Sequence, residues 1–356
     1  MKARGLVSEG ERMKKFASTL VWAALVMALN AVPQNLSVVC AQDTGRVKEL
    51  FGDPNFERGF RATDICRSPS FLGDLKLPFQ GEATSDKKPV WGLATHASRY
   101  NIADAEVVAD AKNATAETPG QIVSRSKDDQ GVATLKLGVR TENEYEAPRK
   151  ADQMWIHLLL TRDFSAKERV AFRDVDSVVF SCDAKVSNVA KTDPDHPYNP
   201  ALHATQASFY FVFSNANADS RDFRDYVWFG ISFFDDRYEV QTDYVEVDGD
   251  ADPNKIGTGK LIYRIGERRT IDECMGGVNP YSQEWTHIET DLKRYLSDAL
   301  EAARKKDFLL DSKPDDFVIA HFNFGWETPG TYRSDLEIKN LRLLAKFKGE
   351  SEPSTP

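Results

Sequence analysis

The segment YVWFGISFFDD, from Tyr226 to Asp236, constrains the fold more than any other stretch of the chain. Successive side chains of a β-strand point to opposite faces, so the odd-numbered residues from Val227 to Phe233 form one uniformly apolar face. The opposite face is mixed: it carries Trp228 and small residues, and Asp236 stands at its end. A strand of this kind predicts a sheet with one face in a hydrophobic core and another that could hold a ligand.

Comparable alternation recurs along the rest of the chain, whereas a helical pattern is found in one place. Further strands are predicted at Met154–Leu160, Val175–Val186, Phe209–Ser214, Val318–Trp326 and Leu336–Leu344, with a hairpin around Lys127–Gly131. The one convincing helical pattern covers 291–306. No repeat or low-complexity linker divides the chain. We therefore expect an all-β fold: a single jelly-roll β-sandwich domain over 46–347 with one packed helix.

The N-terminal segment has the features of a secretory signal peptide. Lys14 and Lys15 precede an apolar run from Leu20 to Leu29, and small residues lead up to Ala41. This pattern predicts that residues 1–41 are removed by cleavage near Ala41 and that the protein is exported, to the periplasm or the extracellular space. A run of about ten residues is half the length that spans a bilayer, so no membrane anchor is expected. The tail 348–356 is expected to be disordered.

Charge and cysteine content narrow the classes of partner. Without residues 1–41 the chain keeps 41 basic and 53 acidic residues, a net charge of −12, so nucleic acid and anionic membranes are poor partners. Three cysteines remain, Cys66, Cys182 and Cys274, which allow at most one disulfide and leave its pairing open. Cys182 alternates in register with apolar neighbours and is expected to be buried.

Five runs of sequence together resemble a known group of proteins: HATQASFYFVFSN, DYVWFGISFFDDRYE, TGKLIY, FNFGWETPGTY and LEIKNLRL. They are similar to exported bacterial jelly-roll proteins, in the manner of carbohydrate-binding modules and of the concanavalin-like sandwiches of polysaccharide-degrading systems. The resemblance covers roughly Trp155 to Leu344. It implies a β-sandwich that handles carbohydrate.

The mixed face of the central strand and its neighbours supply a candidate site for poly- or oligosaccharide on a concave sheet. We expect Trp228 to stack on a sugar ring and polar groups to bond its hydroxyls, with a neutral or weakly charged glycan as the ligand. The candidate ligand-binding residues are Trp228, Asp236, Arg237, Tyr210, His157, His321, Asn323 and Glu327, with Gln206 beside them. The alternative to a sugar site is that Trp228 packs in the core and that the histidines make structural hydrogen bonds.

Catalysis is the main alternative to binding. A glycoside hydrolase needs two carboxylates at a defined separation, and Asp236 with Glu327 is the first pair to test. A polysaccharide lyase would use His321 and Tyr210 as base and acid, with Arg237 neutralising the substrate. No E-x-D-x-x-E, Gly-x-Ser-x-Gly or His-Glu-x-x-His motif is present, so the catalytic residues stay open. A third alternative is a non-catalytic envelope or adhesion protein.

One acidic run suggests a metal site. Asp248, Asp250 and Asp252 alternate as in the start of a calcium-binding loop. Pro253 and Gly259 stand where such a loop needs a turn glycine and a bidentate glutamate. The alternative is a solvated acidic turn, and no other cofactor is expected.

Overall fold

The computed structural model describes residues 46–65, 70–150, 153–193, 195–237, 242–248, 258–277, 281 and 283–349. The predicted signal peptide, Cys66 and residues 350–356 of the predicted tail lie outside these ranges, so export, cleavage near Ala41 and disorder of the tail stay predictions. None of the helices within the described ranges has the length and apolar character needed to cross a membrane.

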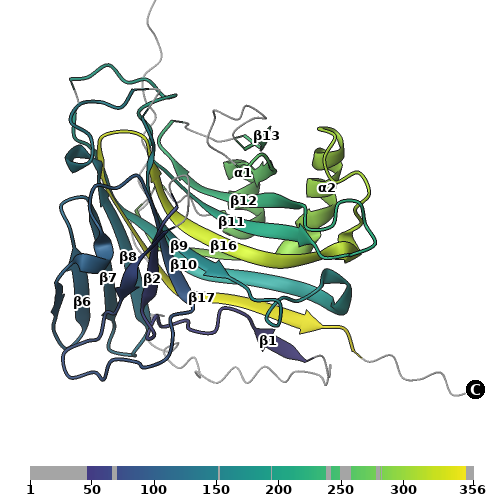
Figure 1. Cartoon of the computed structure of the whole chain (residues 1–356), viewed down its shortest axis with the longest axis horizontal. Coiled ribbons are helices and arrows are strands. Elements are labelled where there is room, and N and C mark those ends of the chain that lie inside the picture. The colour runs from purple at the N-terminus through teal and green to yellow at the C-terminus, as the bar shows by residue number, and fades with distance from the viewer. Residues whose placement is uncertain are drawn as a thin grey trace, which may run out of the picture. The chain divides into compact units, whose positions relative to one another are not determined.

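Two β-sheets pack face to face as the layers of a sandwich (Figure 1). In spatial order, the eight-stranded sheet consists of β15 (Thr286–Asp291), β10 (Val175–Lys191), β17 (Tyr332–Phe347), β8 (Ala133–Arg140), β7 (Gln121–Lys127), β6 (Asn113–Glu117) and β5 (Val107–Ala109), with β1 (Val47–Glu49) also paired to β17. The nine-stranded sheet consists of β13 (Tyr244–Val247), β14 (Leu261–Ile265), β12 (Tyr226–Asp235), β11 (Gln206–Asn215), β16 (Phe317–Thr328), β9 (Ile156–Asp163), β4 (Trp91–His96), β2 (Phe60–Asp64) and β3 (Ser70–Leu75). The expected all-β jelly-roll sandwich is confirmed.

Two α-helices lie in the described ranges, one more than the sequence indicated. The predicted helix over 291–306 is present as a 3-10 turn, η5 (Leu292–Tyr295), continued by α2 (Leu296–Arg304). The other, α1 (Glu267–Cys274), was missed because its eight residues ERRTIDEC are too few and too polar to show an apolar stripe. The remaining 3-10 turns are η1 (Ile102–Asp104), η2 (Thr141–Asn143), η3 (Phe172–Asp174) and η6 (Pro314–Asp316).

The core lies between the sheets and is rich in phenylalanine. Phe180 of β10 meets Phe209, Phe211 and Phe322 of the opposite sheet with ring centroids 5.1–5.9 Å apart. Burying each such ring contributes about 1.5–3 kcal/mol. Cys182 lies in the same core, fully buried as expected. Like Cys274 it is a free thiol, so neither belongs to a disulfide.

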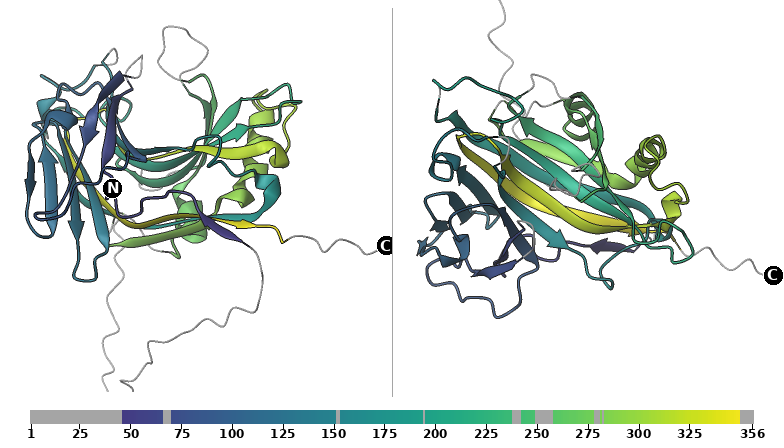
Figure 2. Two further views of the ribbon diagram at one scale, coloured as in Figure 1. Left: turned by 60° about the horizontal axis from the view of Figure 1, so that its bottom comes forward. Right: turned by 45° about the horizontal axis from the view of Figure 1, so that its top comes forward.

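The nine-stranded sheet curves along its width. In the left view of Figure 2, the purple and blue strands β2–β4 rise at one end and the green strands β13–β14 at the other. The side of this sheet that faces away from the eight-stranded sheet is called the open face below. Residues that share a row across the open face are fixed by the pairing register of the strands.

Candidate functional site

The two faces of β12 differ as the sequence predicts. Val227, Phe229, Ile231 and Phe233 have no exposed surface and point into the core. Trp228 points the other way and is partly exposed on the open face. The uniformly apolar face of the central strand is therefore confirmed, and packing of Trp228 inside the core is excluded.

A β-bulge near the end of β12 changes which carboxylate reaches the open face. Ser208 of β11 pairs with Ser232, but the next residue, Ala207, pairs with Phe234, so Phe233 is an extra residue in β12. After the bulge the side chains change faces, and Asp235 stands opposite Gln206. The prediction that Asp236 ends the mixed face is wrong, because the strict alternation on which it rests breaks at Phe233.

Asp236 instead supports the backbone at the end of the sandwich. Its Oδ1 accepts a hydrogen bond of 2.8 Å from the Thr205 N–H, and its Oδ2 accepts bonds from the hydroxyls of Tyr332 and Tyr198. Glu327 makes none of these contacts. The structure therefore does not bring Asp236 and Glu327 together as the proposed hydrolase pair.

Glu327 and Asp235 are linked across the open face by two intervening side chains. Gln206 Nε2 donates to Glu327 Oε2 over 2.6 Å, and the guanidinium of Arg237 donates to Gln206 Oε1. Arg237 also forms a two-pronged ion pair with Asp235, with distances of 2.7 and 2.5 Å. Since Asp235 is fully buried and held at both oxygens, its role is structural.

An aromatic row forms the second part of the open face. The ring of Trp228 meets Tyr226 and His321 edge-on, with centroids 6.0 and 5.7 Å apart. His321 Nδ1 lies 2.6 Å from Asp163 Oδ1, which fixes the imidazole and holds the pKa of Asp163 below its usual range. The Trp228 indole N–H donates to Thr258 Oγ1 over 3.2 Å, and Thr258 in turn donates to Asp248 Oδ2.

Tyr210, Asn323 and Arg264 form the third part, and Arg264 was not among the predicted residues. The register places Asn323 beside Tyr210, Tyr210 beside Gly230, and Gly230 beside Arg264. A side chain at Gly230 would meet Tyr210 at 2.7 Å and Arg264 at 2.8 Å, so glycine is what allows these two groups to come together. Side chains from the neighbouring strands thus fill the space over Gly230 of β12.

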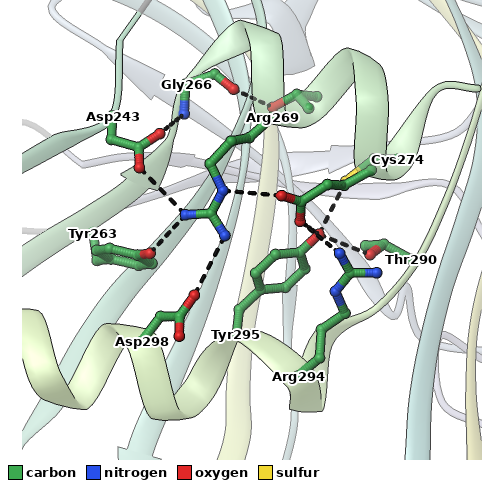
Figure 3. Close-up of polar contacts among 11 residues, drawn as sticks. Asp243, Tyr263, Gly266, Arg269, Cys274, Thr290, Arg294, Tyr295 and Asp298 are labelled. Carbon is green, nitrogen blue, oxygen red and sulfur yellow. Dashed lines mark hydrogen bonds and ion pairs between the residues drawn. The ribbon is translucent and has the colours of Figure 1, made fainter. Parts of the chain in front are cut away.

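The strand that carries Arg264 is anchored from its other side by a polar cluster (Figure 3). Arg269 of α1 donates to Tyr263, Glu273 and Asp243 over 3.1, 3.1 and 3.3 Å, and lies 3.3 Å from Asp298 of α2. Arg269 thereby ties both helices to the end of β14. This network fixes the position of β14, and hence of Arg264.

His157, another predicted residue, also lies on the open face. The register places it opposite Glu327, and its ring stacks on His96 with centroids 4.8 Å apart. Neither of its ring nitrogens has a hydrogen-bond partner among the described residues. Burial, together with the nearby His96, lowers the pKa of His157 to about 3, so it is neutral near pH 7.

Glu327 and Tyr210 on the open face have pKa values shifted toward the neutral form of each group. Burial raises the pKa of Glu327; the Gln206 hydrogen bond and the Arg264 charge oppose this, and the charge of Asp248 adds to it. Burial likewise raises the pKa of Tyr210 to about 12. Glu327 is therefore suited to donate a proton or a hydrogen bond, more than to act as a permanent charge.

The three residues proposed for a lyase are only partly brought together. Tyr210 and His321 both contact the ring of Trp228, with centroids 6.3 and 5.7 Å away. Arg237 instead lies with Gln206 and Asp235. The guanidinium group near Tyr210 belongs to Arg264, since the side chains of both residues close over Gly230.

The calcium hypothesis falls largely outside the described residues, which include Asp248 but neither Asp250 nor Asp252. Asp248 accepts hydrogen bonds from the N–H and hydroxyl of Thr258. No group of three or more potential metal ligands gathers in the described ranges. Calcium binding by the acidic run stays a prediction.

Comparison with known proteins adds a resemblance of fold. No protein-family model matches the sequence, and no curated protein matches it. Among solved structures, the chain is similar to the endoglucanase Cel12A of Rhodothermus marinus, with 10% identity, a TM-score of 0.36, and 69% of this chain and 96% of that chain covered. It is also similar to a family 12 xyloglucanase of Bacillus licheniformis, with 11% identity, a TM-score of 0.35, and 68% and 97% covered. Similarity at this level does not show that the chain shares the activities or the active-site residues of those enzymes.

Proposed function

We propose that the protein binds a carbohydrate chain on the open face of the nine-stranded sheet. The observation that carries this proposal is the partly exposed Trp228 ring, held between Tyr226 and His321, with polar side chains in the adjacent rows. An indole can stack on the apolar face of a pyranose while amides and carboxyls bond its hydroxyls. Asn323, which stands opposite Tyr210 in the strand register, places an amide on the same face for this role.

The expected place of action is outside the cell. The basic residues, short apolar run and small residues before Ala41 support export. Polysaccharides are accessible to an exported protein there. N-terminal sequencing of protein from its native host tests this part: an intact Met1 or an acylated Cys40 would contradict it.

Hydrolysis of the bound chain is a second candidate, favoured by the state of Glu327. A carboxyl group with a raised pKa can protonate a glycosidic oxygen, as a general acid does. Asp248 is close enough for its charge to affect Glu327, so it is the candidate for the second carboxylate. Asp235 is held by Arg237 and Asp236 by Tyr332, which leaves neither free for this role.

A glycan array on the protein without residues 1–41, followed by product analysis of each hit, tests both candidates. Binding without new reducing ends is the result expected from the first proposal. If reducing ends accumulate, Glu327→Gln and Asp248→Asn should abolish them while binding persists. Tyr226→Phe is the matched control on the same face, because it keeps the ring and the carboxylates. Absence of any bound glycan would overturn the proposal and leave the envelope or adhesion alternative.

A further inference from the structure

Four arginines have more than 90% of their surface buried, and one of them differs from the others in its partners. They are Arg125, Arg149, Arg162 and Arg264, which are 4, 4, 5 and 6% exposed. A guanidinium has five N–H donors and always carries charge, so burying one is costly unless acceptors surround it. The partners of each arginine therefore show whether its charge is used inside the fold.

Three of the four have at least three acceptor groups each. Arg125 pairs with Glu82 at 2.7 Å and also donates to two backbone carbonyls. Arg162 pairs with Glu168 at 2.6 Å and likewise donates to two carbonyls. Arg149 has no carboxylate partner among the described residues but donates to three carbonyls. Each of these arginines is explained by the folded structure alone.

Arg264 lacks such a set. It lies near Tyr210, on the other side of Gly230, and its guanidinium stands over the ring of Tyr244, 5.4 Å from the centroid. Within the described ranges its Nε–H has no acceptor and no carboxylate forms an ion pair with it. The acid across the open face, Glu327, is bonded to Gln206 instead. Among the described residues, therefore, this buried cation has no carboxylate in an ion pair with it, and only the charge of Glu327 acts on it from across the face.

We propose that Arg264 receives the carboxylate of a uronic acid, so that the carbohydrate recognised by the open face is an acidic one. This inference rests on the proposed carbohydrate function and replaces the expectation of a neutral or weakly charged glycan. A planar guanidinium binds a carboxylate through two parallel hydrogen bonds, which adds geometric selectivity to the attraction. Tyr210, neutral at pH 7, can donate its hydroxyl to the same carboxylate.

The net negative charge of the chain allows the proposal to be tested through the salt dependence of binding. A net charge of −9 repels a polyanion on average, and Asp248 and Glu246 lie near the open face. Salt screens such long-range repulsion over about 10 Å at 0.1 M, whereas a buried ion pair is screened far less. Binding through Arg264 should therefore persist from low salt to about 0.15 M. Non-specific adsorption of a polyanion on basic side chains would weaken over the same range.

The test compares one uronic-acid oligomer with its carboxyl-reduced counterpart, which has the same linkages but no charge, by calorimetry at constant salt. Wild-type protein should bind the acidic oligomer at least tenfold more tightly than the reduced one. Arg264→Gln should bring the two affinities within about twofold, while Arg221→Gln, which removes the same charge from a residue 87% exposed elsewhere on the surface, should keep the preference. Arg264→Lys keeps the charge but not the planar pair of N–H donors, so it should lose part of the preference for the acidic oligomer.

Each outcome has a distinct meaning. Equal wild-type affinity for the two oligomers, or an unchanged preference in Arg264→Gln, would overturn the uronate proposal and leave carbohydrate binding intact. If a sulfated neutral oligomer binds as tightly and with the same dependence on Arg264, the recognised anion is sulfate and the uronate proposal is overturned. If no oligomer or array glycan binds, the proposed function itself fails. Thermal melting verifies that each variant is folded, and Arg264→Lys decides the question should Arg264→Gln not fold.

Discussion

The two faces of the nine-stranded sheet are built from the same strands, yet they satisfy their side chains in different ways. On the core face, Phe209 and Phe324 stack with centroids 3.8 Å apart, and every odd-numbered residue from Val227 to Phe233 is fully buried. On the open face, Arg264 and His157 keep polar atoms for which the described residues supply no partner. On the core face, packing of apolar side chains accounts for the residues present. On the open face, packing and hydrogen bonding among the described residues leave these polar atoms unexplained.

The first prediction tests whether the two faces of β12 are packed differently, by truncating one ring on each face. Phe229→Ala should lower the free energy of unfolding by about 3–5 kcal/mol, because Phe229 is fully buried among Phe213, Tyr263 and Tyr295. Trp228→Ala should cost less than about 1.5 kcal/mol, because its ring is partly exposed. Urea denaturation measures both. Equal losses would mean that the two faces are equally packed.

The second concerns the buried arginines. Arg162→Met should cost roughly 3 kcal/mol, at the low end for breaking a buried pair because Glu168 reaches solvent. Arg264→Met should change stability by less than about 0.5 kcal/mol or increase it, because no ion pair is lost. Comparison of the two denaturation midpoints is the check. A loss in Arg264→Met as large as that in Arg162→Met would show that Arg264 is a structural residue.

The third compares two partly exposed tryptophans on opposite sheets. Trp228→Ala should weaken glycan binding by about 1–2 kcal/mol if stacking on a sugar resembles other aromatic contacts in strength. Trp285→Ala is the matched control, since Trp285 lies by Lys185 and Lys339 of the eight-stranded sheet. Calorimetry on the best array glycan separates the two. Unchanged affinity in Trp228→Ala would remove the stacking contact.

The fourth and smallest effect is a pH dependence of stability due to His157. Its pKa is about 3 in the folded protein and near 6.5 when unfolded, so below pH 6.5 the unfolded state binds the extra proton. Stability should therefore fall with decreasing pH, by at most about 1.4 kcal/mol per unit from this group. Denaturation at pH 6.5 and pH 5 should show a smaller decrease for His157→Phe than for wild type. His287→Phe, at an exposed histidine, is the control, and it should leave the wild-type decrease in place.

The parts of the fold that rest on local alternation could be predicted, and those that rest on pairing between distant strands could not. The core face of β12 follows from a period of two and holds throughout 227–233. The bulge at Phe233 left no signal, because an apolar pair such as Phe233 and Phe234 is compatible with either face. Asp236 was therefore placed on the wrong side.

Arg264 was missed for a related reason. It lies in the short apolar run LIYRI, where an isolated arginine is itself a signal of burial or of function. Its neighbours, however, depend on the parallel pairing of β14 with β12, and the segment between these strands contains more than twenty residues. No local pattern specifies that pairing, so the contact between Arg264 and Tyr210 becomes visible only in the folded chain.

The central claim, that the open face of the nine-stranded sheet is the carbohydrate site, is tested most directly by a crystal structure of the protein with its best-bound oligosaccharide. We expect sugar density across β12, β11 and β16, with one ring on Trp228 and a carboxylate within hydrogen-bonding distance of Arg264. Sugar bound elsewhere, for example around Trp285 on the eight-stranded sheet, with the open face left empty, would contradict it.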